Sequence, residues 1–454
     1  MTPTTYGRDF AYCLKSHGGV RGFNASLWRF LLRCTLFCHS VATFLTSVSS
    51  YEGGCGFEDK KNVLIAVVEF KNLYKRLANK GILLNRLLHY ANKVNASYCI
   101  LCNDTEGYFY KANNYNNIEN IEVPLSNLEL IIRSIIEEIN NLEEKFNPNE
   151  ILSIFRQTKN ECNLNNRQFN NFIDELDVDY IKNNISKLPD GRFSLSEEFE
   201  RKFFTNMLID REFNQLCRYT SLSSTIRIIK EKKASVCSIA CMNDKSECYY
   251  FDQYINNIDK IDYSSLSPYT IKEINSTFIS SCAEIESKDK LTMWRMYGND
   301  AKGTCLIYNI DKDLLDNNFF IAPISYAEKD KKHPYIEFIK KLLEKDVCFN
   351  QLNIWKHFFK PVDYKDEKEI RLLYFCDDES KFKWIQSSDE IFCPIIEFPI
   401  NDGNNKYPLI IEEIILGPKC SEKITNRQQL QLYCSYNKIP KKVNITLSEI
   451  DNYR

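Results

Sequence analysis

The chain has 454 residues, of which 26% are charged, and its formal net charge is −2. This length exceeds what one hydrophobic core normally serves, so we expect a multidomain protein of the α+β class. The nearly neutral balance excludes a broad basic field for binding DNA or a membrane surface. The 18 cysteines are scattered through apolar segments, for example at Cys99, Cys237, Cys305, Cys376 and Cys393, so we expect buried, reduced thiols in a cytoplasmic protein.

The first 56 residues differ in composition from the remainder of the chain. Acidic residues are almost absent there, and glycine is concentrated. The apolar stretch 26–47 is interrupted by Arg29, Arg33 and His39, so it does not qualify as a membrane span. We therefore interpret residues 1–56 as an atypical, disordered leader, and we expect no membrane partner.

A new module is predicted over residues 57–147, beginning with an apolar run that ends in Glu69-Phe70-Lys71. Residues two apart on a strand project from the same face, so Glu69 and Lys71 would point into one site, which Asp59 could join. Two converging carboxylates can hold Mg²⁺, and a lysine beside them can activate the attacking water. The alternative is a core strand with polar residues at its exit.

The elements after this run are a helix over 81–91, a strand over 96–102, a turn over 104–107 and an aromatic strand over 108–110. This order resembles the nuclease-type domain at the start of type I restriction subunits, which has the PD-(D/E)xK endonuclease fold. The resemblance implies an α/β nuclease-like module with a magnesium site at Asp59 and Glu69 and with Lys71 as its catalytic lysine.

A helical connector is predicted over residues 148–210. An amphipathic helix over 125–146 leads to it, and one or two helices are expected over 149–178. A hairpin follows over 187–194, with Asp190-Gly191 at its tip, and the order suits a small winged-helix-like unit. Arg167 is the one cation of the candidate recognition segment 163–174, so we favour a spacer over a DNA-reading role.

A mixed α+β module is predicted over residues 211–454, with strands over 278–282, 305–308, 369–375 and 413–416. Five ordered blocks mark it, at residues 217–221, 243–247, 291–298, 366–373 and 411–418. In order and spacing these blocks resemble the bacterial domain-of-unknown-function family 2971, over roughly residues 211–430. That family implies no defined activity.

The block Trp294-Arg295-Met296-Tyr297-Gly298 is the most distinctive of the five. A guanidinium can bind a phosphate or carboxylate, and aromatic rings can flank a nucleobase. We therefore expect Trp294, Arg295 and Tyr297 to line the principal cleft of this module. The alternative is a core plug of tryptophan and methionine followed by a turn.

The same module resembles, more distantly, the ADP-ribosyltransferases. The resemblance implies that Arg218 holds NAD, that Thr220 or Ser221 assists, and that Ser280 or Ser281 takes the middle position. It also implies that Glu369 supports the oxocarbenium-like cation, with Glu367 two residues earlier on the same strand face. The structural alternatives are a salt bridge between Glu369 and Arg371 and a surface role for Arg218.

Three functions remain open at this point. The first is a bacterial defence- or toxin-type effector that binds a nucleotide and transfers ADP-ribose from NAD to a protein or nucleic-acid target. The second is a Mg²⁺-dependent nuclease of restriction type with a carboxy-terminal sensor module. The third is a non-catalytic binding protein, and a homodimer is left open for each.

Overall fold

The computed structural model describes the backbone of six short strands between residues 48 and 123, and residues 146–451 apart from 163, 189, 243–247, 259–267, 316–317, 387–391, 401–404 and 438–442. Among the six strands, side chains are described at Tyr98 and Cys99. The helix predicted at 81–91, the helix predicted at 125–146 except for its last residue, the residues Asp59 and Lys71, and the block 243–247 lie outside the described residues. The chain divides into two compact units.

The first unit consists of Met1–Ile151, Val178–Phe199 and Asp346–Asn350, and the second of Leu152–Asp177, Glu200–Lys345 and Gln351–Arg454. Residues predicted as a connector, 148–210, are therefore distributed over both units. Their elements follow the expected order of helices, hairpin and helix. They are α5 (Pro148–Cys162), α6 (Arg167–Glu175), α7 (Val178–Asn184), β7 (Ile185–Lys187), β8 (Phe193–Leu195) and α8 (Glu197–Leu208).

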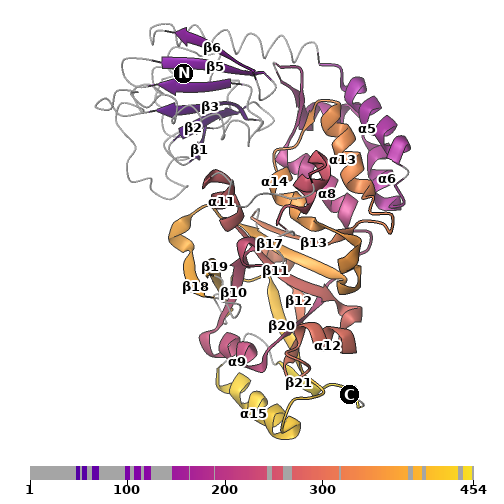
Figure 1. Cartoon of the computed structure of the whole chain (residues 1–454), viewed down its shortest axis with the longest axis vertical. Coiled ribbons are helices and arrows are strands. Elements are labelled where there is room, and N and C mark those ends of the chain that lie inside the picture. Colours follow the sequence, from indigo (N-terminus) through magenta and orange to yellow (C-terminus); the bar gives the residue numbers. More distant parts are fainter. Residues whose placement is uncertain are drawn as a thin grey trace, which may run out of the picture. The chain divides into compact units, whose positions relative to one another are not determined.

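A six-stranded sheet dominates the first unit, with its strands in chain order (Figure 1). The strands are β1 (Val48–Tyr51), β2 (Gly54–Glu58), β3 (Leu64–Phe70), β4 (Tyr98–Cys102), β5 (Gly107–Asn113) and β6 (Asn117–Val123). Only β3 and β4 pair in parallel, and such a pair needs a crossover connection. The strands predicted at 96–102 and 108–110 are confirmed.

The predicted boundary at residue 57 is wrong, because β1 and β2 already belong to this sheet. Both strands are short, and glycine occupies two of the five positions of β2, so neither shows the apolar alternation that marks a strand. A second sheet of this unit joins β7, β8 and β15 (Val347–Cys348), with β15 parallel to β8. The predicted hairpin turn is confirmed, and Gly191 at its tip has φ of +93°.

A ten-stranded sheet forms the core of the second unit (Figure 1). Its strands are β9 (Gln215–Thr220), β10 (Lys233–Ser238), β11 (Thr277–Glu284), β12 (Thr304–Ile310), β13 (Phe319–Pro323), β17 (Glu369–Phe375), β18 (Lys383–Gln386), β19 (Phe392–Pro399), β20 (Leu409–Leu416) and β21 (Asn444–Leu447). Four of them, β11, β12, β17 and β20, confirm the predicted strands. β11 is the branch point, because it pairs with β9, β10 and β17.

Each face of this sheet packs against a different core. On the α9 face, Leu216, Leu306 and Leu372 meet Ile229 of α9 (Leu222–Glu231) and Leu430 of α15 (Lys423–Tyr436). On the α12 face, the alternate strand residues Cys217, Tyr219, Ala283, Cys305 and Ile307 meet Trp294 of α12 (Leu291–Tyr297). Because successive strand residues point to opposite faces, register alone decides which core a side chain enters.

The remaining helices of the second unit are α10 (Tyr250–Asn256), α11 (Pro268–Asn275), α13 (Pro334–Glu344) and α14 (Leu352–Trp355). A cluster of aromatic rings joins the helical part, with Phe203 at its centre. The ring of Phe203 lies 5.2 Å from that of Phe169 and 6.1 Å from that of Phe338. Arg201 of α8 connects this part to β13, because its Nη1 donates to the Phe319 carbonyl at 3.1 Å.

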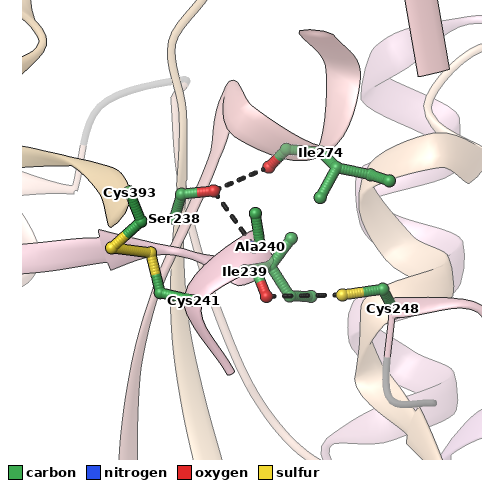
Figure 2. The surroundings of a disulfide bond; sticks show 7 residues. All are labelled: Ser238, Ile239, Ala240, Cys241, Cys248, Ile274 and Cys393. Atoms are coloured by element: carbon green, nitrogen blue, oxygen red, sulfur yellow. Dashed lines mark hydrogen bonds between the residues drawn. A yellow bond between two sulfur atoms is a disulfide. The ribbon is translucent and has the colours of Figure 1, made fainter. Parts of the chain in front are cut away.

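One disulfide is described, between Cys241 and Cys393 (Figure 2). The expectation of a reduced thiol at Cys393 is therefore wrong, whereas Cys99, Cys237, Cys305 and Cys376 are free thiols. No local sequence pattern marks this pair, because its two cysteines lie 152 residues apart.

We predict that Phe203→Ala lowers the free energy of unfolding by about 3–5 kcal/mol, because it removes a fully buried ring from this aromatic cluster. Tyr436→Ala is the control, since that ring is 82% exposed at the end of α15. Urea denaturation measures both. Equal stability of the two variants would contradict the account of this core.

Candidate functional site

Arg218 lies on β9 and points to the α9 face of the sheet. Its Nη1 donates a hydrogen bond to the Ser280 hydroxyl at 3.0 Å. Ser280 lies on β11 and is 1% exposed, so the two side chains meet against the covered face of the sheet. The structure thus brings together two of the residues that sequence reasoning assigned to a ligand site.

The surroundings of Arg218 are neutral. The largest electrostatic effects on its guanidinium come from Tyr308, Tyr407, Cys282 and Cys237. Burial raises the pKa of Tyr407 to about 12, and it raises that of Tyr308 further, so both rings are uncharged at neutral pH. Among the described residues, the hydrogen bond to Ser280 is the one that this guanidinium makes.

A small, partly open pocket with about 20 Å³ of free space lies beside these two tyrosines. Its wall is mostly aliphatic, and the polar groups in it are the two phenols and the Asn405 amide. The lining residues are Ile228, Ala234, Tyr308, Ile400, Asn405, Tyr407, Leu409, Ile410 and Ile411. The arrangement places one partly buried cation near an apolar pocket that contains two tyrosines.

Ser221 has a structural role that accounts for it fully. It is the N-cap of α9, and its hydroxyl accepts the backbone N–H of Ser224 at 3.0 Å. The carbonyl of Thr220 lies against the backbone of Gly303, where a Cβ would approach it to 2.1 Å. The predicted role of these two residues in holding a cofactor has no support from this geometry.

The structure contradicts the prediction that Trp294 lines a cleft, whereas Arg295 and Tyr297 of the same predicted wall reach the surface. Trp294 is fully buried, packs edge-on against Tyr219 with ring centroids 4.8 Å apart, and donates from Nε1 to Asp289 at 2.6 Å. Arg295 is exposed, and Tyr297 is 40% exposed. Neighbouring helix positions point about 100° apart, so the alternative of a core plug followed by a turn is the correct one.

The turn after α12 explains the glycines of this block. Asn299, Asp300 and Ala301 all have positive φ, and a Cβ on Gly298 would lie 2.5 Å from the Trp294 ring. At Gly303, the obstacle is the Thr220 carbonyl of the neighbouring strand. The glycines of this block are therefore explained by the close packing of the turn against Trp294 and β9.

Glu369 is buried on β17 and is held by two cations. Arg371 donates from Nε at 2.8 Å and from Nη2 at 3.0 Å to its two carboxylate oxygens, and Lys360 Nζ lies 2.8 Å away. Burial alone would raise the pKa of Glu369, but Arg371 and Lys360 outweigh it and lower the pKa to about 2. The structural alternative of a salt bridge with Arg371 is thus observed, in the core and not at the rim.

The prediction that Glu367 and Glu369 share a strand face is wrong. It ends the 3-10 helix η8 (Val362–Glu367), and Lys368 has φ of 45°, so the strand begins only at Glu369. Its carboxylate nevertheless joins the same ion network, since Lys360 lies 3.0 Å away and the Tyr297 hydroxyl donates to it.

The residues assigned to one transferase site lie on opposite faces of the sheet. Glu369 is paired with Ala283, which faces the α12 core, whereas Arg218 and Ser280 face the α9 core. Ser281 shares the α12 face with Arg371, and its buried hydroxyl has no hydrogen-bond partner among the described groups. Arg218 and Glu369 therefore do not converge.

At the candidate nuclease site, the backbone of Glu69 is described near the end of β3, opposite Gly54 of β2 and Leu101 of β4. Glu58, the residue before Asp59, pairs with Leu64 at the other end of β3. The register therefore gives no support to a metal site shared by Asp59 and Glu69. Elsewhere in the described part of the chain, no three histidine, cysteine or acidic side chains converge as metal ligands.

Sequence reasoning missed Lys360, Tyr308 and Tyr407. The tyrosines stand in no local motif, and only the fold brings them to Arg218. Lys360 follows Phe358 and Phe359 and precedes Pro361, and a lysine directly after two phenylalanines could have signalled a buried charge.

Residues 293–372 match the model of a family described as a protein of unknown function (DUF2971). The matched segment contains the α12 turn and the ion network of Lys360, Glu367, Glu369 and Arg371. It supports the resemblance to that family in this part of the chain. No curated protein and no solved structure matches. In the described residues, the helices are too short or too polar to cross a bilayer.

We predict that Gly303→Ala destabilises the protein by about 1–3 kcal/mol or more, because the added Cβ meets a backbone carbonyl that cannot move alone. Gly191→Ala is the comparison, since nothing lies within 4 Å of a Cβ there and the cost is its positive φ. Thermal melts measure both. A Gly303→Ala variant as stable as wild type would contradict the packing role of the motif.

We also predict that Glu369→Gln costs about 3–5 kcal/mol of stability, because it leaves Arg371 and Lys360 buried with one charge too few. Glu379→Gln is the control, since its ion pair with Lys272 is exposed. The folded pKa of Glu369 lies below its unfolded value, so its contribution is complete above about pH 4.5 and is lost as the pH falls toward 2. Denaturation at pH 7 and pH 3 should show the difference between wild type and Glu369→Gln shrinking at the lower pH.

Proposed function

We propose that the second unit binds the anionic group of a nucleotide-type ligand at Arg218, as the ligand-binding part of a bacterial defence- or toxin-type effector. The observation that carries this proposal is the state of Arg218. It is a partly buried cation whose one hydrogen bond, among the described residues, goes to the neutral hydroxyl of Ser280.

A buried charge without a counter-charge costs several kcal/mol, and protein cores rarely retain one without a use for it. The guanidinium has five N–H donors in a planar fork, which matches the oxygens of a phosphate or carboxylate. A bound anion would pair the charge and occupy the remaining donors. Pairing the Arg218 charge with a bound anion would therefore contribute favourably to the binding free energy.

The pocket near Arg218 offers aromatic side chains, Tyr308 and Tyr407, for the other part of such a ligand. Both rings are buried and the free space is small, so binding of a planar ring requires these side chains to move apart. The Asn405 amide is already committed to the Tyr407 backbone, since it donates to the carbonyl at 3.2 Å and accepts the N–H at 3.3 Å. The remainder of the pocket wall is aliphatic. NAD is the first ligand to test, because the resemblance to ADP-ribosyltransferases names it.

Transfer of ADP-ribose is a further step that this geometry does not favour. The transfer needs a carboxylate close to the sugar of the bound nucleotide. Glu369 is on the other face of the sheet and is committed to Arg371 and Lys360. The proposal is therefore nucleotide binding, with no catalytic acid assigned among the described residues.

We predict that Arg218→Met weakens binding of NAD or ADP-ribose about 10- to 100-fold, the value of one charged hydrogen-bonded contact. The same variant should melt at the wild-type temperature or higher, because methionine removes an unpaired buried charge. Arg227→Met, an exposed position of α9, is the matched control and should change neither quantity. Calorimetric titration and thermal melts are the measurements. Wild-type affinity in an unfolding-prone Arg218→Met variant would make Arg218 a structural residue.

A second candidate function, Mg²⁺-dependent nucleic-acid cleavage, is favoured by one observation in the first unit. The E-x-K segment ends β3, and the next strand, β4, returns parallel to it after the stretch 71–97. Parallel return is what the strand–helix–strand order of the restriction-type resemblance requires. The metal partner of Glu69 is not assigned.

We predict that Glu69→Ala abolishes any Mg²⁺-dependent cleavage of plasmid or RNA, with a loss of about a hundredfold or more, since a metal contributes several kcal/mol to such a reaction. Glu122→Ala, in β6, is the control. Equal cleavage by wild type and Glu69→Ala would remove the nuclease function from this site. Absence of both cleavage and NAD binding would favour a non-catalytic binding protein with another ligand.

A further inference from the structure

The disulfide between Cys241 and Cys393 joins two segments at the point where their hydrogen-bonded ladder stops. β10 and β19 pair from Lys233↔Pro399 to Cys237↔Ile395. The next residue of β19 is Pro394, which has no N–H to donate. Beyond Pro394, the disulfide takes the place of the hydrogen bonds. It joins Cys393 of β19 to Cys241 in the turn η2 (Ile239–Cys241) (Figure 2).

The two sulfur-bearing residues differ in access. Cys241 is half-buried, whereas Cys393 is 1% exposed. A nearby free cysteine, Cys248, is buried. Its thiol donates to the Ile239 carbonyl of the same turn at 3.3 Å, on the side away from the disulfide in Figure 2. A thiol from solution therefore reaches the bond at Cys241.

The β18–β19 hairpin depends on this connection more than the rest of the sheet does. β18 is an edge strand, and in the described part of the chain β19 is its one partner. Trp384 and Phe392 stack on each other at 5.2 Å and are 52% and 69% exposed. The hairpin end is thus tied to the sheet by few buried contacts, among them the ring contact of Phe382 with Phe278 at 5.0 Å.

We propose that Cys241–Cys393 is a thiol–disulfide exchange site for small thiols, and that its reduction releases the end of the β18–β19 hairpin from η2. The thiolate of the small thiol attacks the Cys241 sulfur, a mixed disulfide forms there, and Cys393 leaves as a thiolate that takes a proton. A second molecule of the thiol then attacks the mixed disulfide. It frees the Cys241 thiol and leaves the small thiol as its own disulfide, so two electrons are accounted for.

The consequence is local. The Ser238 hydroxyl still donates to the Ile274 carbonyl at 3.0 Å and accepts the Ala240 N–H at 3.1 Å after reduction, so η2 keeps its place (Figure 2). The β10–β19 ladder is likewise independent of the disulfide. The segment that gains freedom is the exposed hairpin end, which carries the Trp384–Phe392 pair.

The test uses the full chain purified without reductant. Non-reducing peptide mapping should find a linked peptide containing Cys241 and Cys393, and addition of glutathione should give a mixed disulfide at Cys241. Hydrogen exchange should rise at least tenfold over 383–395 on reduction, and hardly at all over β12 and β20. Cys241→Ser should reproduce the reduced pattern without reductant, and Cys248→Ser should behave as wild type.

Two results would overturn the proposal. One is the absence of the linked peptide in the oxidised chain. The other is a linked peptide whose reduction leaves hydrogen exchange over 383–395 unchanged. The disulfide would then have no influence on the hairpin end. If Cys241→Ser folds poorly, Cys393→Ser examined by the same exchange measurement takes its place, with the same two outcomes.

Discussion

The alternation of side chains along β11 and its neighbours is the constraint on which the second unit depends. Both faces of the sheet are covered, so each strand residue enters one of two separate cores. Residues that lie opposite each other on neighbouring strands point to the same face and can contact each other. Residues one position apart on a strand point to opposite faces, so the sheet separates their side chains. Ser280 and Ser281 illustrate this, because one meets Arg218 and the other lies opposite Arg371.

The two faces treat buried charge in different ways. On the α12 face, Arg371 and Lys360 are neutralised by Glu369 and Glu367, and the carboxylate of Glu369 is held in place from two sides. Such a network is complete, and it orders the junction between η8 and β17. On the α9 face, the guanidinium of Arg218 meets hydroxyl and thiol groups that carry no charge. The proposed ligand site is thus the one whose cation has no charged partner among the described residues.

The family match falls on the complete network and not on Arg218, since it spans residues 293–372. The shared pattern is therefore explained by architecture. The tryptophan, the glycines of the turn and the Glu369–Arg371 pair all fix how α12, β12 and β17 meet. Specificity for a ligand would then reside in residues outside the matched segment, such as Arg218 and Tyr407.

The sequence predicted individual strands of the second unit well, but it predicted poorly which side chains the fold brings together. Apolar runs with β-branched residues identified β11, β12, β17 and β20, because burial on both faces leaves a continuous apolar pattern. The strands β1 and β2 were missed for lack of such a pattern. The site was misjudged for a different reason, since spacing places Glu367 and Glu369 on one face only if both are in the strand. A residue with positive φ, Lys368, removes that condition, and nothing in the local sequence marks it.

Exposure was also beyond the reach of local pattern. Trp294 and Arg295 are adjacent in sequence, yet one is fully buried and the other exposed, because only the docking of α12 on the sheet decides which side of the helix is covered. The pairing of Cys241 with Cys393 depends in the same way on the complete topology.

The most direct test of the central claim is an experimental structure of the full chain with ADP-ribose. The account predicts that a phosphate group contacts the Arg218 guanidinium on the face that bears Tyr407, while Glu369 keeps its two bonds to Arg371. A ligand bound beside Glu369 on the α12 face, or a carboxylate of the chain itself paired with Arg218, would contradict it.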